Sequence, residues 1–191
     1  MATTQAERHQ RILQAAVAIA REGGFDDVQM RSVADRAGVA LGTLYRHFPS
    51  KVNLLVSALA WRFEEADAAL QRHPVAGATP TERVEAMLGW LTQSLQREPL
   101  LTEALTRAFM SADASVAAQA DAVEARLVAM LTRVMPGPGY DLGPRRGDND
   151  VALSRVIADV WLSALVAWVT GRSSAEHVQE HVSTAVRLVL R

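Results

Sequence analysis

The sequence contains no cysteine among its 191 residues. This absence excludes disulfide bonds and metal sites built on thiolates, and it agrees with a reducing compartment. The first ten residues, MATTQAERHQ, are polar and charged, unlike the apolar centre of a signal peptide. We therefore expect the protein to be cytoplasmic.

The sequence also lacks an apolar run long enough to cross a bilayer. The most apolar stretch, VIADVWLSALVAWV at residues 156–169, includes Asp159. It is shorter than the roughly 20 residues that a transmembrane helix needs. We interpret it as a buried helix and expect no membrane partner.

Motifs of the common enzyme classes are missing as well. The sequence has no G-x-S-x-G elbow, Walker loop or dinucleotide-binding fingerprint. Residues 177–181, HVQEH, do match the H-x-x-E-H signature of a zinc-peptidase class. His177 and His181 would lie on one helical face, but residues 182–191 contain no acid to act as a third ligand. We expect a solvated or interfacial histidine pair, and no enzyme, metal or cofactor.

Lysine is nearly absent. Lys51 is the only one, and the other 19 basic residues are arginines. The chain has a net charge of −1, but residues 1–51 contain seven basic and five acidic residues, whereas the remainder contains 13 and 16. This mild excess of basic groups favours an anionic partner at the N-terminal end.

Apolar residues make up 49% of the sequence, enough for a packed core. They recur at helical spacing in almost every segment, and no strand pattern is found. Thr79-Pro80-Thr81-Glu82 combines a capping box with proline at the first helical position, which is typical of a helix start. We predict an all-α fold of about nine helices, with a long loop at 136–150. The predicted helices cover residues 5–22, 29–37, 41–47, 51–72, 80–98, 99–110, 115–134, 150–171 and 174–190.

Two short predicted helices, 29–37 and 41–47, are joined by a tight turn that begins at Gly38. This arrangement is typical of a helix-turn-helix. Outward residues of the second helix would offer groups suited to the major groove of DNA, and Lys51 could reach a phosphate. The alternative is a helical corner with a solvated polar face. The outward residues are Gly42, Thr43, Tyr45, Arg46 and His47.

Residues 11–56, and especially VADRAGVALGTLYRHFPSKVNLL, resemble the TetR family of transcriptional repressors. The resemblance implies a three-helix DNA-binding domain at residues 1–51, and a ligand-binding and dimerisation domain at residues 52–191. It also implies a homodimer on a palindromic operator in double-stranded DNA, released by an inducer. Leu41 departs from the polar residue of many family members. The residues implied to face bases are Arg31, Leu41, Gly42 and Thr43, and those implied to face phosphates are Tyr45, His47 and Lys51.

Two further segments, LQREPLLTEAL and VWLSALVAWVTGR, are similar to the branch of that family that represses cholesterol and steroid catabolism. The similarity implies a bulky lipophilic effector. Large apolar side chains on several predicted helices would suit such a ligand, although ordinary core packing is the alternative for each. The candidate lining residues are Met87, Trp90, Leu91, Leu105, Phe109, Met110, Leu127, Trp161, Leu165 and Trp168. The candidate polar residues are Thr92, Gln93, Thr106 and Asn149.

The last two predicted helices suit a dimer interface. The helix at 150–171 is apolar nearly all round, so it must be covered on several sides. Pairing with the same helices of a second copy would form a four-helix interface; the alternative is that they only close the core of one chain. The candidate interface residues are Val160, Ala164, Val178, Val182 and Val186.

These observations predict a ligand-responsive, DNA-binding repressor. The alternative is an all-α ligand-binding or interaction protein whose helix-turn-helix does not bind DNA.

Overall fold

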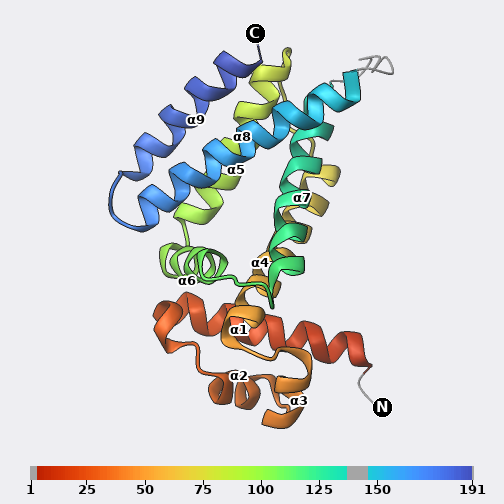
Figure 1. Cartoon of the computed structure of the whole chain (residues 1–191), viewed down its shortest axis with the longest axis vertical. Helices are drawn as coiled ribbons and strands as arrows, with labels where there is room; N and C mark the ends of the chain where they lie inside the picture. The colour runs from red at the N-terminus through yellow and green to blue at the C-terminus, as the bar shows by residue number, and fades with distance from the viewer. Residues whose placement is uncertain (1–3, 137–145, 191) are drawn as a thin grey trace. The chain divides into compact units, whose positions relative to one another are not determined.

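A computed structural model of the chain describes residues 4–136 and 146–190, except for the side chains of residues 146–148. These residues form nine α-helices and no strand (Figure 1). The predicted all-α fold is therefore confirmed for the described part of the chain. The helices are α1 (Gln5–Asp27), α2 (Met30–Ala37), α3 (Leu41–His47), α4 (Lys51–Arg72), α5 (Pro80–Gln96), α6 (Pro99–Met110), α7 (Ala117–Val134), α8 (Arg146–Val169) and α9 (Ala175–Val189).

Helix starts follow the local capping chemistry. The hydroxyl of Thr79 accepts a hydrogen bond from the backbone N–H of Glu82 at 3.2 Å, and the Glu82 carboxylate accepts one from the N–H of Thr79 at 3.4 Å. This is the predicted capping box. An equivalent pair of bonds joins Thr4 and Glu7 at the start of α1. The two boxes satisfy N–H groups that a helix start otherwise leaves unpaired.

Two boundaries differ by more than two residues from the predicted ones. Helical structure in α1 continues to Asp27, but the backbone breaks at Gly24, whose φ of 73° is left-handed and favours glycine. Helix α8 begins at Arg146 rather than at residue 150. Residues 137–145 of the expected loop lie outside the described residues. The last proline of that segment is Pro144, so no proline stands within the helix that begins at Arg146.

The chain divides into two compact units. The first unit contains residues 1–62 and 98–123, and thus α1 to α3, the start of α4, α6 and the start of α7. Its core is mainly apolar, and Leu44 of α3 and Phe48 just after that helix contribute to it. Helix α6 packs along α1 within this unit and contributes Leu101, Leu105 and Ala108.

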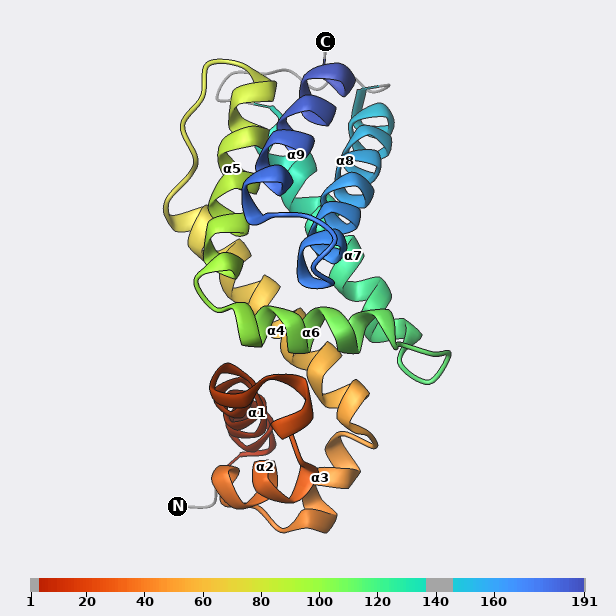
Figure 2. The same ribbon diagram turned by 90° about the vertical axis from the view of Figure 1, so that its left-hand side faces the viewer.

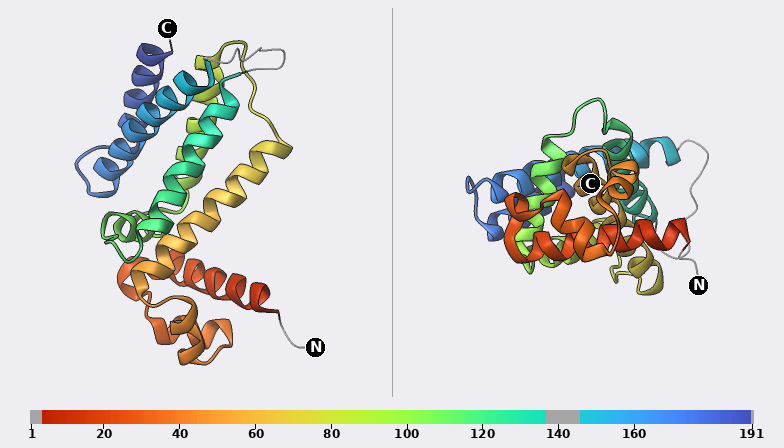
Figure 3. Two further views of the ribbon diagram at one scale, coloured as in Figure 1. Left: turned by 45° about the vertical axis from the view of Figure 1, so that its right-hand side comes forward. Right: turned by 90° about the horizontal axis from the view of Figure 1, so that it is seen from below.

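The second unit contains residues 63–97 and 124–191. Helices α8 and α9 run antiparallel and side by side, and α9 also packs against α5 (Figures 1 and 3). Trp161 on α8 is buried, lies edge-on to Phe63 with 6.3 Å between ring centroids, and donates a hydrogen bond to Thr92 on α5. One aromatic residue thus links three helices of the unit.

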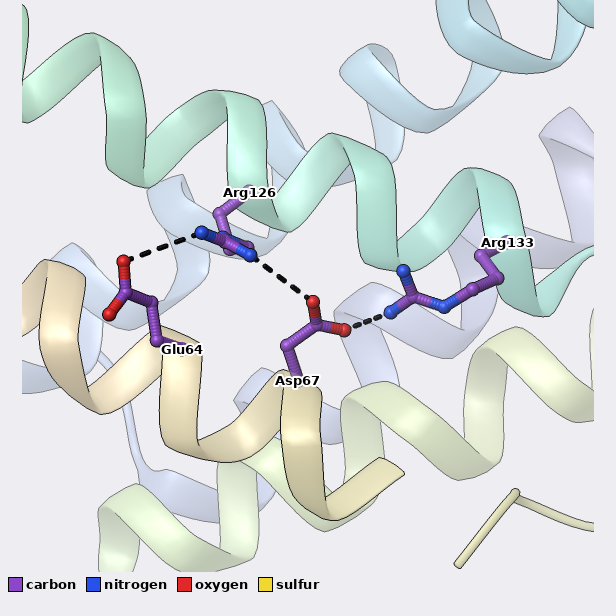
Figure 4. A network of polar contacts seen from close by, with 4 residues as sticks. All are labelled: Glu64, Asp67, Arg126 and Arg133. Atoms are coloured by element: carbon purple, nitrogen blue, oxygen red, sulfur yellow. Dashed lines mark hydrogen bonds and ion pairs between the residues drawn. The ribbon is translucent and has the colours of Figure 1, made fainter. Parts of the chain in front are cut away.

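A polar network joins the end of α4 to α7 inside the second unit (Figure 4). The buried carboxylate of Asp67 pairs with Arg133 and, at 3.4 Å, with Arg126. Arg126 also contacts Glu64 at 3.4 Å. Because two guanidinium groups face one buried carboxylate, the charge of Asp67 is compensated where water is excluded.

Candidate nucleic-acid interface

The turn between α2 and α3 is built on Gly38. Its φ of 64° and ψ of 43° are left-handed, and its N–H donates to the carbonyl of Asp35 at 3.2 Å. The N–H of Val39 donates to the carbonyl of Ala34 at 3.0 Å. These two bonds form a Schellman motif, which ends α2 and turns the chain sharply into α3. Figure 2 shows α2 and α3 side by side as a result.

Helix α3 presents one face to its own unit and another to solvent. Leu44 is fully buried, whereas Gly42, Tyr45 and Arg46 are exposed, and Thr43 and His47 are half-buried. Tyr45 keeps 47% of its surface exposed. The guanidinium of Arg46 lies 3.4 Å from the hydroxyl of Thr43, one turn earlier. The outward groups named from the sequence therefore share one surface.

Leu41 begins α3 and is 39% exposed. It therefore does not serve mainly as a core residue. A Cβ atom added at Gly42 would meet nothing within 4 Å. Packing within this chain thus gives no reason for a glycine at that position. Arg31 is exposed near the start of α2. Near the end of the same helix, Arg36 makes a bidentate pair with Glu22 at 2.8 and 2.6 Å, which holds α2 against α1.

Lys51, at the start of α4, is half-buried and does not extend freely into solvent. Its ammonium lies 4.0 Å from the ring centroid of Phe25. Burial lowers the pKa of Lys51 below its usual range. The guanidinium of Arg107 on α6 lies 4.3 Å from the same ring centroid. Sequence reasoning missed Phe25 and Arg107, because no local pattern links residues so far apart in the chain.

His47 has an unforeseen neighbour, His9 on α1. The two imidazole centroids are 5.9 Å apart, and His9 also lies 4.7 Å from the ring of the buried Phe48. Burial, and then the charge of His47, lower the pKa of His9. A histidine on α3 thus lowers the pKa of one on α1 at the edge of this surface.

The candidate effector-binding residues are divided between the two units. Met87, Leu91, Leu127, Trp161 and Leu165 are buried in the second unit. Three others belong to the first unit: Leu105 is in its core, Phe109 is half-buried and Met110 is 55% exposed.

Two tryptophans of the second unit are partly accessible, since Trp90 is 40% exposed and Trp168 is half-buried. Of the polar candidates, Thr92 accepts a hydrogen bond from the indole N–H of Trp161, and Thr106 is buried in the first unit. Gln93 and Asn149 are exposed.

Three of the candidate dimer residues are already buried within one chain, contrary to the expectation that they face a partner. Val178, Val182 and Val186 are at most 2% exposed, because α9 packs against α5 and α8. Ala164 is also buried, and Val160 is half-buried. Helical spacing identifies an apolar face but does not tell which neighbour covers it. The large apolar residues of α8 and α9 that are exposed, among those described, are Val151, Val156 and Leu188.

Helix α8 is longer than the apolar stretch at 156–169, because it starts earlier, at Arg146. The expectation that its apolar part is too short to cross a bilayer is therefore wrong: the segment Asn149–Val169 has 21 residues, and 33% of it is buried. Among the described residues it is the one helix that could cross a membrane by length and composition alone. Core helices of soluble proteins meet the same criterion.

The H-x-x-E-H segment forms an exposed histidine pair. The rings of His177 and His181 are stacked on α9 with 6.2 Å between centroids. Within the described ranges, no group of three or more metal-ligating side chains includes them.

Two family profiles match the chain. One, described as bacterial regulatory proteins of the tetR family, matches residues 12–58, and the other, a tetracyclin repressor-like C-terminal domain, matches residues 77–189. The HTH-type transcriptional repressor KstR of Mycobacterium tuberculosis is 51% identical over 186 residues, which cover 97% of this chain and 82% of that protein.

Solved structures share the fold. A TetR transcriptional regulator from Rhodococcus sp. RHA1 superposes with a TM-score of 0.84 at 27% identity, over 97% of both chains. The TetR-family repressor FadR of Thermus thermophilus, in complex with lauroyl-CoA, gives a TM-score of 0.73 at 20% identity, over 95% of this chain and 93% of its own.

Proposed function

Because this chain belongs to the TetR family of bacterial regulatory proteins, we propose that it represses transcription as a homodimer bound to a palindromic operator. The proposal assigns DNA binding to residues 1–51 and effector binding and dimerisation to residues 52–191. The protein would act in the cytoplasm, without a cofactor. The observation that carries the proposal is the outward face of α3, where Tyr45, Arg46 and Thr43 surround a glycine that intrachain packing does not require.

On DNA, α3 would enter the major groove. Arg31, Leu41 and Thr43 would reach base edges, and Gly42 would let the backbone come close. Phosphates would be held from the sides by a phenol, an imidazole, a guanidinium and an ammonium group. The phosphate-binding residues in this proposal are Tyr45, Arg46, His47 and Lys51.

Dimerisation is assigned to the outer surface of α8 and α9. Only a third of the apolar segment Asn149–Val169 of α8 is buried in the single chain. Val151 and Val156 on this helix are 41% and 48% exposed. An exposed apolar surface on a long helix favours a partner surface that covers it. A twofold pairing would also present two α3 helices to two half-sites of a palindrome.

The effector is assigned to the lipophilic class. The buried side chains Met87, Leu91 and Leu165 of the second unit are apolar and carry no charge. The FadR structure bound to lauroyl-CoA is an example of this fold with an acyl thioester, and the sequence similarity to the steroid-catabolism branch supports the same class. Binding would favour a dimer whose α3 helices no longer match the operator, a population shift between two states.

The test is operator binding measured by fluorescence anisotropy with DNA selected in vitro by the protein itself. Tyr45→Ala should cost about 1.5–3 kcal/mol per protomer, the usual value of a hydrogen bond to a charged group. Lys51→Ala should weaken binding similarly for all sequences and make the salt dependence shallower by about one unit per protomer. Arg97→Ala, at an exposed arginine after α5, is the control. Binding unchanged in both test variants would instead favour the all-α ligand-binding protein.

A further inference from the structure

We propose that Phe25 is a positioning residue for DNA binding, which holds the ammonium group of Lys51 on its ring and so presents it to an operator phosphate. This role rests on the proposed function above. The ammonium lies 4.0 Å from the centroid of the ring. At that distance a cation is attracted to the negative face of an aromatic ring.

Lys51 needs such support because of where it stands. It lies in the first turn of α4, where the helix dipole disfavours a positive charge. Its long side chain also has many rotamers, and fixing them on a phosphate costs conformational entropy. If the aromatic ring already holds the lysine side chain, that entropy loss is smaller, because fewer rotamers remain to be lost when DNA binds.

The ring itself is fixed from α6. The backbone N–H of Phe25 donates to the carboxylate of Glu103 at 3.4 Å, and the guanidinium of Arg107 lies 4.3 Å from the ring centroid. Arg107 in turn pairs with Asp26 at 3.1 Å and with Glu103 at 3.8 Å. Two side chains of α6 therefore hold the segment that follows the break at Gly24. The ring of Phe25 is thus fixed in position, and it restricts the side chain of Lys51 that lies on it.

Carboxylates lie near Lys51 without taking the place of a phosphate. Burial is the main influence on the pKa of Lys51 and lowers it, as does the charge of Arg107, whereas Asp26, Asp27 and Glu103 raise it. None of them forms a direct ion pair with Lys51 among the contacts of the described residues. The ring is the group that touches the ammonium, and a π face leaves the remaining N–H donors of the lysine available to an anion.

The experiment compares Phe25→Leu, which removes the ring, with Phe25→Tyr, which keeps it. A cation–π contact at a partly exposed site corresponds to roughly a threefold change in affinity per protomer, and thus to about tenfold for a dimer. Phe25→Leu should weaken operator binding by about that factor, and Phe25→Tyr should bind as the wild type does. In a Lys51→Ala background, Phe25→Leu should have no further effect, because the group that it positions is gone.

The single lysine provides a second readout that does not need DNA. Reductive methylation with a ¹³C label keeps the charge and marks one side chain, Lys51, besides the terminal amine. The ring current of Phe25 should move the NMR signal of the labelled lysine upfield in the wild type and in Phe25→Tyr. In Phe25→Leu the signal should return to its position in an unstructured peptide.

The outcomes separate the two proposals. Wild-type protein that binds no DNA would overturn the proposed repressor and with it this role of Phe25. Wild-type binding that Phe25→Leu leaves unchanged would overturn the role of Phe25 alone. An equal loss from Phe25→Leu with and without Lys51 would also overturn it, because the ring would then act through another route. Circular dichroism of each variant shows whether the fold is intact.

Discussion

The indole Nε1 of Trp161 donates a hydrogen bond to the hydroxyl of Thr92, with 2.9 Å between the two atoms. Both residues are 2% exposed, and they join α8 to α5 in the second unit. Neither group can exchange its partner for water while the unit is folded. The pair therefore fixes the relative position of the two helices more specifically than apolar contacts do.

Thr92→Val should lower the free energy of unfolding by about 1–3 kcal/mol, because it leaves the buried indole N–H without an acceptor at nearly constant volume. Urea unfolding followed by circular dichroism measures this loss. Thr184→Val, at an exposed position of α9, is the matched control and should stay within about 0.5 kcal/mol of the wild type. Equal stabilities of the two variants would show that the hydrogen bond contributes little.

Local chemistry made much of the fold predictable. The glycine turn at Gly38 and the cap at Thr79 depend on residues close in sequence, so the helices and their order followed from the sequence alone. The segment that resembles the TetR family contains the same glycine turn. Outward groups of α3 were therefore assigned to the correct face of that helix.

Contacts between distant segments were not predictable. Thr92 and Trp161 are 69 positions apart, and the pairs of Phe25 with Lys51 and Arg107 join three different helices. An apolar stripe on α9 indicated burial but not its partner, which is α5 and α8 of the same chain. Such pairings depend on tertiary packing, and a single sequence carries no signal for them.

The pH dependence of stability should include a contribution from His9. Burial and the charge of His47 lower the pKa of His9 in the folded state, whereas its unfolded value is about 6.5. Between the two values the unfolded chain binds more protons, so stability falls as the pH drops below about 6.5 and levels off below the folded pKa. Between about pH 7.5 and pH 5.5, the wild type should therefore lose more stability than His9→Gln.

The control for this prediction is His73→Gln, which removes an exposed histidine after α4. Urea unfolding of the three proteins at both pH values gives the comparison. An identical pH dependence in the wild type and in His9→Gln would contradict the assigned environment of His9.

Light scattering should give about twice the chain mass of 20.7 kDa. Val156→Arg should shift the protein toward the monomer, because a charge would be buried without a partner in the interface. Val156 is 48% exposed in the single chain, so the fold should tolerate the change, whereas a charge at the buried Val182 would disrupt the chain itself. Leu100→Arg, at a site 47% exposed on α6, is the control. A wild-type monomer at micromolar concentration would contradict the proposed dimer.

Leu41 should read a thymine methyl group in the operator. Its side chain is 39% exposed at the start of α3, and apolar contact with the methyl group is one way to recognise thymine. Replacing the contacted thymine by deoxyuridine should cost the wild type about 0.8 kcal/mol per half-site, the value of one buried methyl-sized group. Leu41→Ala should bind both operators equally. If every single replacement leaves wild-type affinity unchanged, Leu41 does not make this contact.

The effector should be a lipophilic molecule of steroid or fatty-acyl size. The second unit buries Met87, Leu91, Leu127 and Leu165, and its nearby hydroxyl, Thr92, is already occupied by the indole of Trp161. A polar effector among these side chains would leave its own groups unpaired at roughly 1–3 kcal/mol each. A lipophile would gain about 25 cal/mol for each Å² that it buries.

Thermal shifts with a panel of steroids, fatty acids, their coenzyme A thioesters and polar metabolites would identify the class of the effector. A ligand at 100 times its Kd raises the free energy of unfolding by about 2.7 kcal/mol. The same compounds should release the operator in the anisotropy assay, since a ligand that binds without discriminating between the two states shifts nothing. Release by a polar metabolite alone, with no response to any lipophile, would refute the lipophilic effector and leave DNA binding through α3 untouched.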